Sequence, residues 1–414
     1  MLPKKIFIFL FVIFTFLSTD GVCENPQHKS TGFEFNTNRR SVRLPTRIVN
    51  KMVVVPMQIN DSPPLNFILD TGVSTTILTE PFLAHLLEIP LADRVHIIGL
   101  GQDGIVEAAR ARGLTFSMHG ITGENMDLII IPEGVLNFSE VFGFPVHGIL
   151  GYDFFSRFPV RINYRNETVR VFRQPNYRIR RNSEILPLEM EDSKPYVYLQ
   201  LKGDNNHRED SVRLLLDIGA TNPLFLNHDY THLTEKTVPA YLGMGISGRQ
   251  MGKFGRLQEV KLGRFAINSP LVAFPEKSFL TVAQHQWEWE GILGAGILSR
   301  FHIIIDYPSQ QVVLRKNVTF NRPFYISPSG IEVVAKGRNY DIFEITHVRE
   351  KSVAYEQDMQ RGDTIISVNR ITAPRLRMDD ILEILNQEPG TLVYLEILRD
   401  NRILNKTLRL RKDL

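Results

Sequence analysis

The stretch Asn66-Phe-Ile-Leu-Asp-Thr-Gly-Val-Ser74 decides the fold, because a close copy, Arg213-Leu-Leu-Leu-Asp-Ile-Gly-Ala-Thr221, recurs later in the chain. In each copy an apolar run ends in an aspartate, and a glycine follows two residues after it. Short apolar runs bounded by turn residues are typical of buried strands. The sequence therefore places Asp70 and Asp217 at the ends of two equivalent buried strands.

Two further repeats occur in the same order in both halves of the chain. Residues 148–164 and 291–307 share Gly-Ile-Leu-Gly, Ser-Arg-Phe and a final tyrosine. Between the aspartate and this element, each half carries a glycine-rich piece, at 99–104 and 243–248. Three ordered matches at similar offsets indicate two copies of one lobe, which is stronger evidence than any single motif.

Each copy is expected to be a mainly β lobe. Residues 52–58 and 196–202 alternate or run apolar and precede turn-rich stretches, which predicts hairpins whose second strand ends at the aspartate. The expected fold class is mainly β, with two pseudo-symmetric, closed, β-barrel-like lobes followed by a small α+β domain. The expected boundaries are 44–175 for the first lobe, 184–318 for the second and 323–414 for the C-terminal domain.

These motifs resemble those of the aspartic peptidases, in particular the retropepsin-like branch, here with two tandem lobes in one chain. The resemblance covers residues 44–316 and includes Ile-Leu-Gly at 149–151 and 292–294. It implies that Asp70 and Asp217 form a catalytic pair sharing one proton, since two such close carboxylates cannot both ionise. One carboxylate would take a proton from water and the other would hydrogen-bond the scissile carbonyl. No metal or cofactor is implied.

The resemblance also implies roles for residues around the pair. The glycines permit tight turns, and the hydroxyls of Ser74 and Thr221 are expected to bond the outer carboxylate oxygens. The glycine-rich pieces stand where the family has flaps, with ordinary glycine-rich turns as the alternative. The expected supporting residues are Thr71, Gly72, Ser74, Ile218, Gly219 and Thr221. The expected flap residues are Gly99, Gly101, Gly104, Gly243, Gly245 and Gly248.

One position departs from the family pattern. Ile218 stands where the family usually has threonine or serine, whose hydroxyl bonds across to the partner loop. Thr71 can still make its half of this exchange, whereas Ile218 cannot, at a cost of about 1 kcal/mol if the partner group stays hydrated. Both aspartates remain. The sequence therefore favours a working aspartic endopeptidase, with a catalytically inactive peptide-binding scaffold of the cell envelope as the alternative.

The pattern changes from residue 323 onward. Gly-Asp-Thr-Ile-Ile-Ser-Val-Asn at 362–369, followed by Pro-Gly at 389–390 and Leu-Arg-Asp at 398–400, resembles a PDZ domain of the kind common in bacterial peptidases. This implies that backbone N–H groups at 329–331 cradle a peptide's C-terminal carboxylate, while the strand that follows pairs with the peptide. A module that only packs on the lobes is the alternative. The expected peptide-binding residues are Ser329, Gly330, Ile331 and Val333.

The N-terminus predicts export. Lys4 and Lys5 precede an apolar run at 6–17, which is too short to span a bilayer as a helix. A signal peptide at 1–23 is therefore expected, placing the protein in the periplasm or cell envelope of a bacterium, or outside the cell. An uncleaved anchor and a lipid on Cys23 are alternatives. Cys23 is the only cysteine, so an intramolecular disulfide is excluded.

The composition limits the partners. Forty-eight basic and 45 acidic residues among 414 give a net charge of +3, which gives no reason to expect nucleic acid. The arginine-rich stretch at 157–181 alternates with apolar residues and is interpreted as solvated strand faces, with a binding patch as the alternative. The expected partners are protein or peptide substrates, and peptide C-termini at the PDZ domain. Two lobes in one chain remove the usual reason for dimerisation, so a monomer is expected.

Overall fold

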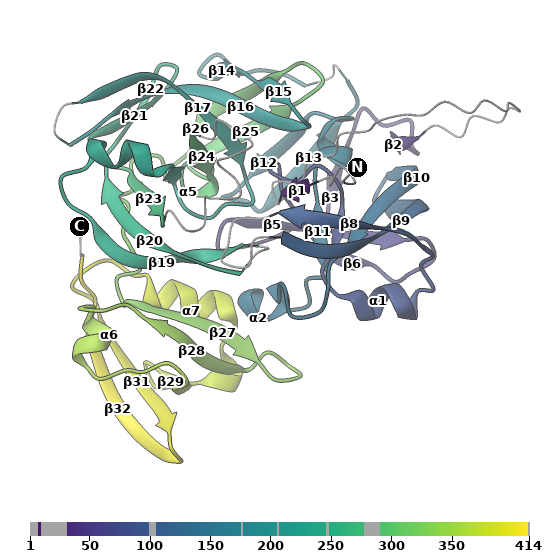
Figure 1. Ribbon diagram of the computed structural model, residues 1–414. Coiled ribbons are helices and arrows are strands. Elements are labelled where there is room, and N and C mark those ends of the chain that lie inside the picture. Colours follow the sequence, from purple (N-terminus) through teal and green to yellow (C-terminus); the bar gives the residue numbers. More distant parts are fainter. Residues whose placement is uncertain are drawn as a thin grey trace, which may run out of the picture.

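The computed structural model describes residues 7–9, 31–98, 105–174, 177–204, 207–245, 248–276 and 290–412. The molecule is mainly β and consists of two lobes joined by a shared sheet, with a smaller C-terminal domain against both of them (Figure 1). The expected signal peptide at 1–23 lies outside the described residues, apart from strand β1 (Phe7–Phe9). Within the described ranges, no helix is long and apolar enough to cross a membrane.

The first lobe is built on a sheet with the order β1-β8-β9-β10-β7-β11-β6-β5-β4, with β2 added to β10. Strand β5 also pairs with β9, so strand pairing is continuous from β5 through β6, β11, β7, β10 and β9 back to β5. The elements are β2 (Gly32–Phe35), β4 (Arg47–Val49), β5 (Met52–Ile59), β6 (Leu65–Leu69), β7 (Ile77–Leu78), α1 (Pro81–Leu86), β8 (Leu91–Ile98), β9 (Ile105–Met118), β10 (Ile121–Ile130), α2 (Phe138–Phe142), β11 (Gly148–Leu150) and α3 (Tyr152–Phe155).

The second lobe repeats this arrangement in the order β19-β20-β23-β18-β24-β17-β16-β21-β22, with β15 added to β16. Its described pairings form an open path, so the closed barrel expected for each lobe stays a prediction. The elements are β15 (Glu189–Glu191), β16 (Lys194–Lys202), β17 (Arg208–Asp217), β18 (Leu224–Leu226), η1 (His228–Leu233), β19 (Val238–Gly245), β20 (Gly248–Arg256), β21 (Glu259–Leu262), β22 (Phe265–Asn268), β23 (Leu271–Pro275), β24 (Gly291–Gly294) and α5 (Ala295–Leu298).

A sheet with the order β14-β26-β25-β12-β13-β3 joins the lobes. The first lobe supplies β3 (Ser41–Leu44), β12 (Val160–Asn163) and β13 (Thr168–Phe172), and the second supplies β14 (Glu184–Pro187), β25 (Phe301–Asp306) and β26 (Gln311–Lys316). Strands β12 and β25 pair antiparallel, with Val160 opposite Ile305 and Asn163 opposite His302. Because these strands are the same element of the two repeats, a pseudo-two-fold axis passes between them.

The C-terminal domain has its own sheet and core. The sheet order is β27-β28-β29-β31-β32, so β27 is an edge strand among the described pairings. A separate apolar cluster, which includes Phe343 and Ile381, fills this domain. The elements are β27 (Ile331–Lys336), β28 (Ile342–Val348), α6 (Val353–Glu356), β29 (Thr364–Val368), β30 (Ile371–Thr372), η3 (Ala373–Arg375), α7 (Met378–Leu385), β31 (Leu392–Arg399) and β32 (Arg402–Arg409).

The segment before β27 packs with the lobes. Phe324 and Ile326 belong to the apolar core shared by the two lobes. The guanidinium of Arg300 lies 3.4 Å from the ring centre of Phe324 and donates a hydrogen bond to the carbonyl of Phe320. The first residues of the expected domain at 323–414 therefore pack with the lobes, and its start at 323 stays a prediction.

Candidate active site

Two equivalent strand pairs deliver the aspartates to the centre of the molecule. Strand β6 runs parallel to β11, and strand β17 runs parallel to β24. The register is the same in both lobes, because Ile149 lies opposite Ile68 and Ile292 lies opposite Leu215. Ile68 and Leu215 each stand two residues before an aspartate. The Gly-Ile-Leu-Gly elements therefore pair with the strands that end at the aspartates.

Asp70 and Asp217 lie side by side, and their side chains are hydrogen-bonded to each other. They are only 8% and 6% exposed. The backbone N–H of Gly72 donates to Oδ1 of Asp70 at 2.7 Å, and that of Gly219 donates to Oδ1 of Asp217 at 2.7 Å. The N–H of Ala220 adds a bond to the same oxygen at 3.2 Å. A Cβ at Gly219 would collide with the Asp70 carboxyl, so glycine permits this approach of the two loops.

The surroundings of the two carboxyls affect their pKa values differently. Burial, together with the charge of Asp217, raises the pKa of Asp70 well above its usual range. Burial also raises the pKa of Asp217, but hydrogen bonds from Asp70 and from two backbone N–H groups oppose this, as does the charge of Lys194. The pair therefore shares one proton, and these contacts favour its place on Asp70 with the negative charge on Asp217.

Thr71 joins the two loops by itself. Its hydroxyl donates to the carbonyl of Leu216 at 2.7 Å and accepts from the N–H of Ile218 at 3.0 Å. Thr71 and Ile218 are both fully buried. The loop connection is therefore one-sided, as the isoleucine in the second motif predicts.

The two tyrosines at the ends of the repeated segments also differ in their contacts with the aspartate loops. The hydroxyl of Tyr307 donates to the carbonyl of Thr71 at 3.3 Å. Its counterpart, the hydroxyl of Tyr164, is buried and has no hydrogen-bond partner among the residues that the structure describes. The shared final tyrosine of the repeat was the signal for both residues, although the sequence assigned them no role in the site.

One expected contact is replaced by another. The hydroxyl of Ser74 donates to the carbonyl of Asp192 at 3.4 Å, rather than to the Asp70 carboxyl as the resemblance implied. Asp192 belongs to the second lobe, so this bond crosses between lobes. Thr221 lines the cleft above the aspartates.

A cleft of about 740 Å³ lies above the aspartates. The hairpin β19–β20 contributes its expected flap residues Gly243 and Gly245 to the cleft wall, and Gly248 pairs with Gly245 across the hairpin. The side-chain amide of Asn222 ties this hairpin to the aspartate loop by donating to the carbonyl of Leu242 at 2.8 Å. In the first lobe β8 and β9 form the matching hairpin, whose expected flap residues lie outside the described residues: Gly99, Gly101 and Gly104.

The C-terminal domain lines the same cleft. Gly330, Ile331 and Val333 are part of the wall, whereas Ser329 is fully buried beside them. Gly330 has a φ of +79°, and a side chain there would collide with Ser352. Three of the four expected peptide-binding residues therefore face the cleft that holds the aspartates, a placement that the sequence did not predict.

Lys194 is a residue of the site that the sequence analysis missed. It is 1% exposed, and burial lowers its pKa to about 7 although nearby acids, including Asp217, favour its charged form. Its counterpart in the first lobe is Met52, since both residues follow two-residue turns with positive φ and start the hairpin strand. A comparison of the two hairpins would have shown this lysine in place of an apolar residue.

We expect Lys194→Met to move the acidic limb of the pH–activity profile to higher pH. The lysine is charged below about pH 7 and lowers the pKa of Asp217, so its removal lets the pair take up a second proton at higher pH. Methionine is the residue that the first lobe carries at this place. The measurement is kcat/KM against pH, with Lys51→Met, in the equivalent hairpin turn of the first lobe, as the control for loss of a lysine charge. An unmoved acidic limb would show that Lys194 does not act on the pair.

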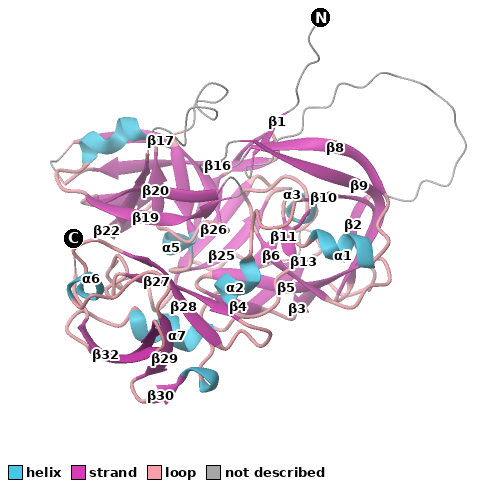
Figure 2. Cartoon of the chain, turned by 60° about the horizontal axis from the view of Figure 1, so that its bottom comes forward, coloured by secondary structure: helices cyan, strands magenta, loops and turns pink. Residues whose placement is uncertain are grey.

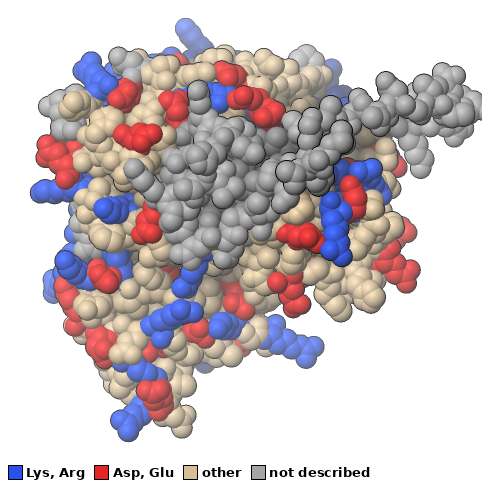
Figure 3. Space-filling view, viewed as in Figure 1, with Lys and Arg blue, Asp and Glu red and all other residues tan. Residues whose placement is uncertain are grey.

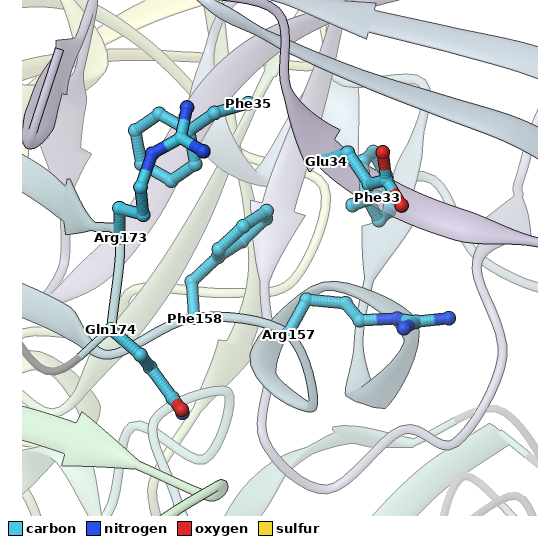
Figure 4. A pocket seen from close by; sticks show the side chains of 7 residues that line it. All are labelled: Phe33, Glu34, Phe35, Arg157, Phe158, Arg173 and Gln174. Atoms are coloured by element: carbon cyan, nitrogen blue, oxygen red, sulfur yellow. The ribbon is translucent and has the colours of Figure 1, made fainter. Parts of the chain in front are cut away.

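A second, smaller hollow of about 250 Å³ lies away from the aspartates. Figure 4 shows the ring of Phe158 between the side chains of Arg157 and Arg173. Arg157 donates to the carbonyl of Thr31, and the Arg173 guanidinium lies 5.0 Å from the ring centre of Phe35. These arginines hold the N-terminal strand β2. Elsewhere, on the face in Figure 3, basic and acidic side chains are interspersed.

Comparisons with known proteins agree with this architecture. Residues 55–154 match a family model described as aspartyl protease, and residues 344–399 match one described as PDZ domain. The crystal structure of basic 7S globulin from soybean is similar over 67% of this chain and 95% of its own, with 11% identity and a TM-score of 0.40. No curated relative matches in sequence. The chain thus combines an aspartyl protease region with a C-terminal PDZ domain.

Proposed function

We propose that this protein is an aspartic endopeptidase in which Asp70 and Asp217 activate a water molecule. The observation that carries the proposal is the hydrogen-bonded pair of buried carboxyls, one from each lobe, at the base of a cleft. The one-sided Thr71 connection keeps the loops joined despite Ile218. This supports a working enzyme over an inactive peptide-binding scaffold.

The two carboxyls divide the chemistry. Asp217, which carries the charge, takes a proton from the water as it attacks the scissile carbonyl carbon. Asp70, which holds a proton, donates a hydrogen bond to the carbonyl oxygen as negative charge develops there. As the C–N bond breaks, Asp217 gives the proton that it took from water to the leaving nitrogen, and Asp70 keeps its own. Water has then been added across the peptide bond without a covalent enzyme intermediate.

Acid-favoured hydrolysis of peptides tests the function. We expect activity to decline as the pH rises through the raised pKa of Asp70, because both carboxyls are then ionised. Metal chelators and reagents for serine or cysteine nucleophiles should leave the rate unchanged, since carboxylates do this work. The measurement is cleavage of a fluorogenic peptide mixture across pH, with and without each reagent. Inhibition by a chelator would contradict the mechanism, and inertness at every pH would favour the scaffold.

The PDZ domain supplies peptide binding beside the catalytic lobes. We infer that its ligands are peptide C-termini, held by the loop at Gly330 and by strand addition to β27. The apolar N-terminal run supports export to the cell envelope. Partition of the protein between cytoplasmic and envelope fractions tests the location.

A further inference from the structure

The peptide groove of the PDZ domain opens into the active-site cleft. This groove lies between the edge strand β27 and helix α7, which pack against each other. Ile331 and Val333 of β27 and Leu382 of α7 line the same cleft as Asp70 and Asp217. Figure 1 shows the small domain with β27 and α7 turned toward the two lobes. A peptide bound in this groove therefore lies within the space that leads to the aspartates.

Helix α2 of the first lobe covers the far end of this groove. A Cβ on Gly143, just after α2, would lie 2.6 Å from Cβ of Met378 on α7 and 3.4 Å from Cβ of Ala335 on β27. Both views in Figures 1 and 2 place α2 beside β27 and α7. An ion pair of 3.0 Å between Arg47 and Asp379 fastens the same junction. A peptide therefore cannot run straight on past Ala335.

The near end of the groove favours a negative group. The guanidinium of Arg349 lies 3.6 Å from the position of a Cβ on Gly330, at the turn before β27, while donating to the carbonyl of Ser327 at 3.1 Å. Glu332 also lines the cleft. Burial raises the pKa of Glu332 to about 7, so this acid is largely neutral in mildly acidic conditions, where it does not repel a carboxylate.

We propose that the enzyme trims protein tails, cutting at a set distance from a free C-terminal carboxylate held at the Gly330 turn. The last residues of the substrate pair with β27. The chain then meets α2 and turns into the cleft, where water is added across one peptide bond to give a new carboxylate and a new amine. This inference rests on the proposed function. It makes the PDZ domain a subsite of the active site rather than a separate module.

The decisive experiment compares one random peptide mixture made as free acids and as C-terminal amides. We expect the free acids to be cut at least about tenfold faster, because an amide loses the charge-assisted hydrogen bonds of a carboxylate. Mass spectrometry should place the cuts at one distance from the C-terminus. Residues inserted upstream of the cut should leave this distance unchanged.

A substitution pair on α7 tests the groove directly. Leu382→Glu puts a charge into the groove and should raise KM for free acids more than for amides, so that the preference for free acids is lost. Glu383→Gln, on the exposed side of α7, is the matched control and should change neither. If acids and amides are cut equally and the cuts follow sequence rather than distance, tail trimming is wrong and the endopeptidase stands. If neither mixture is cut, the proposed function fails as well.

Discussion

Asp70→Asn should abolish peptide cleavage while leaving the fold intact. Asp70 is the protonated member of the pair, so asparagine replaces a neutral acid by a neutral amide of the same shape and can still donate to Asp217. An amide is a far weaker acid than a carboxylic acid, so it cannot stabilise the negative charge that develops on the carbonyl oxygen as Asp70 does. Loss of a positioned acid–base group costs roughly 10²–10⁴-fold in rate. The measurement is kcat/KM on the peptide mixture at the optimum pH of the parent.

The same variant should be more stable than the parent at neutral pH. The folded-state pKa of Asp70 is raised, so the parent loses stability as the pH rises from the pKa of the unfolded chain toward the folded value. Asparagine does not titrate, so the gain should be absent near pH 3.5 and present near pH 7.5 in thermal melts. These values bracket the usual aspartate pKa of about 3.9.

Asp153→Asn provides the matched control. Asp153 is another buried acid whose pKa burial raises, here to about 7, and its side chain accepts hydrogen bonds from Thr76. Its asparagine variant should likewise gain stability at neutral pH but keep its activity, because Asp153 does not line the cleft. Equal cleavage by Asp70→Asn and the parent would show that the pair is not catalytic.

The place of the aspartates was predictable because it depends on a local pattern, an apolar run that ends in an aspartate, which occurs twice in the chain. Each apolar strand, each glycine and each Gly-Ile-Leu-Gly element occupies the same register in both lobes. The one-sided loop connection was also predictable, because the identity of residue 218, an isoleucine, shows that this side chain has no hydroxyl. These features need only the knowledge that the two motifs face each other.

Contacts between distant elements were not predictable. Ser74 bonds a carbonyl of the other lobe, and no local pattern distinguishes that carbonyl from the carboxyl that the resemblance implied. Lys194 follows a polar hairpin turn, a position that is usually solvated, yet it is buried in the folded chain. The contact of Gly143 with Met378 joins residues that are far apart in the chain, so the placement of the PDZ groove in the cleft required the structure.

Thr71→Val should be the most destabilising single substitution in the site. The Thr71 hydroxyl both donates and accepts, so valine leaves the carbonyl of Leu216 and the N–H of Ile218 buried without this partner. Each unmet buried group costs about 1–3 kcal/mol, so we expect the free energy of unfolding to fall by roughly 2–6 kcal/mol. The measurement is the midpoint of urea unfolding, together with kcat/KM.

Two further variants show whether the Thr71 hydroxyl, the Thr71 methyl group or the missing hydroxyl at Ile218 is responsible for the effect. Thr71→Ser keeps both hydrogen bonds and loses one methyl group, worth about 1 kcal/mol, so it should retain activity. Ile218→Thr supplies the hydroxyl that the second lobe lacks. It should change the rate of an already active enzyme, because the aspartates carry out the proton transfer. If Thr71→Val unfolds no more readily than Thr71→Ser, the hydroxyl does not hold the loops together. If the parent is inert and Ile218→Thr cleaves peptides, the natural protein is a scaffold whose second loop has lost its support.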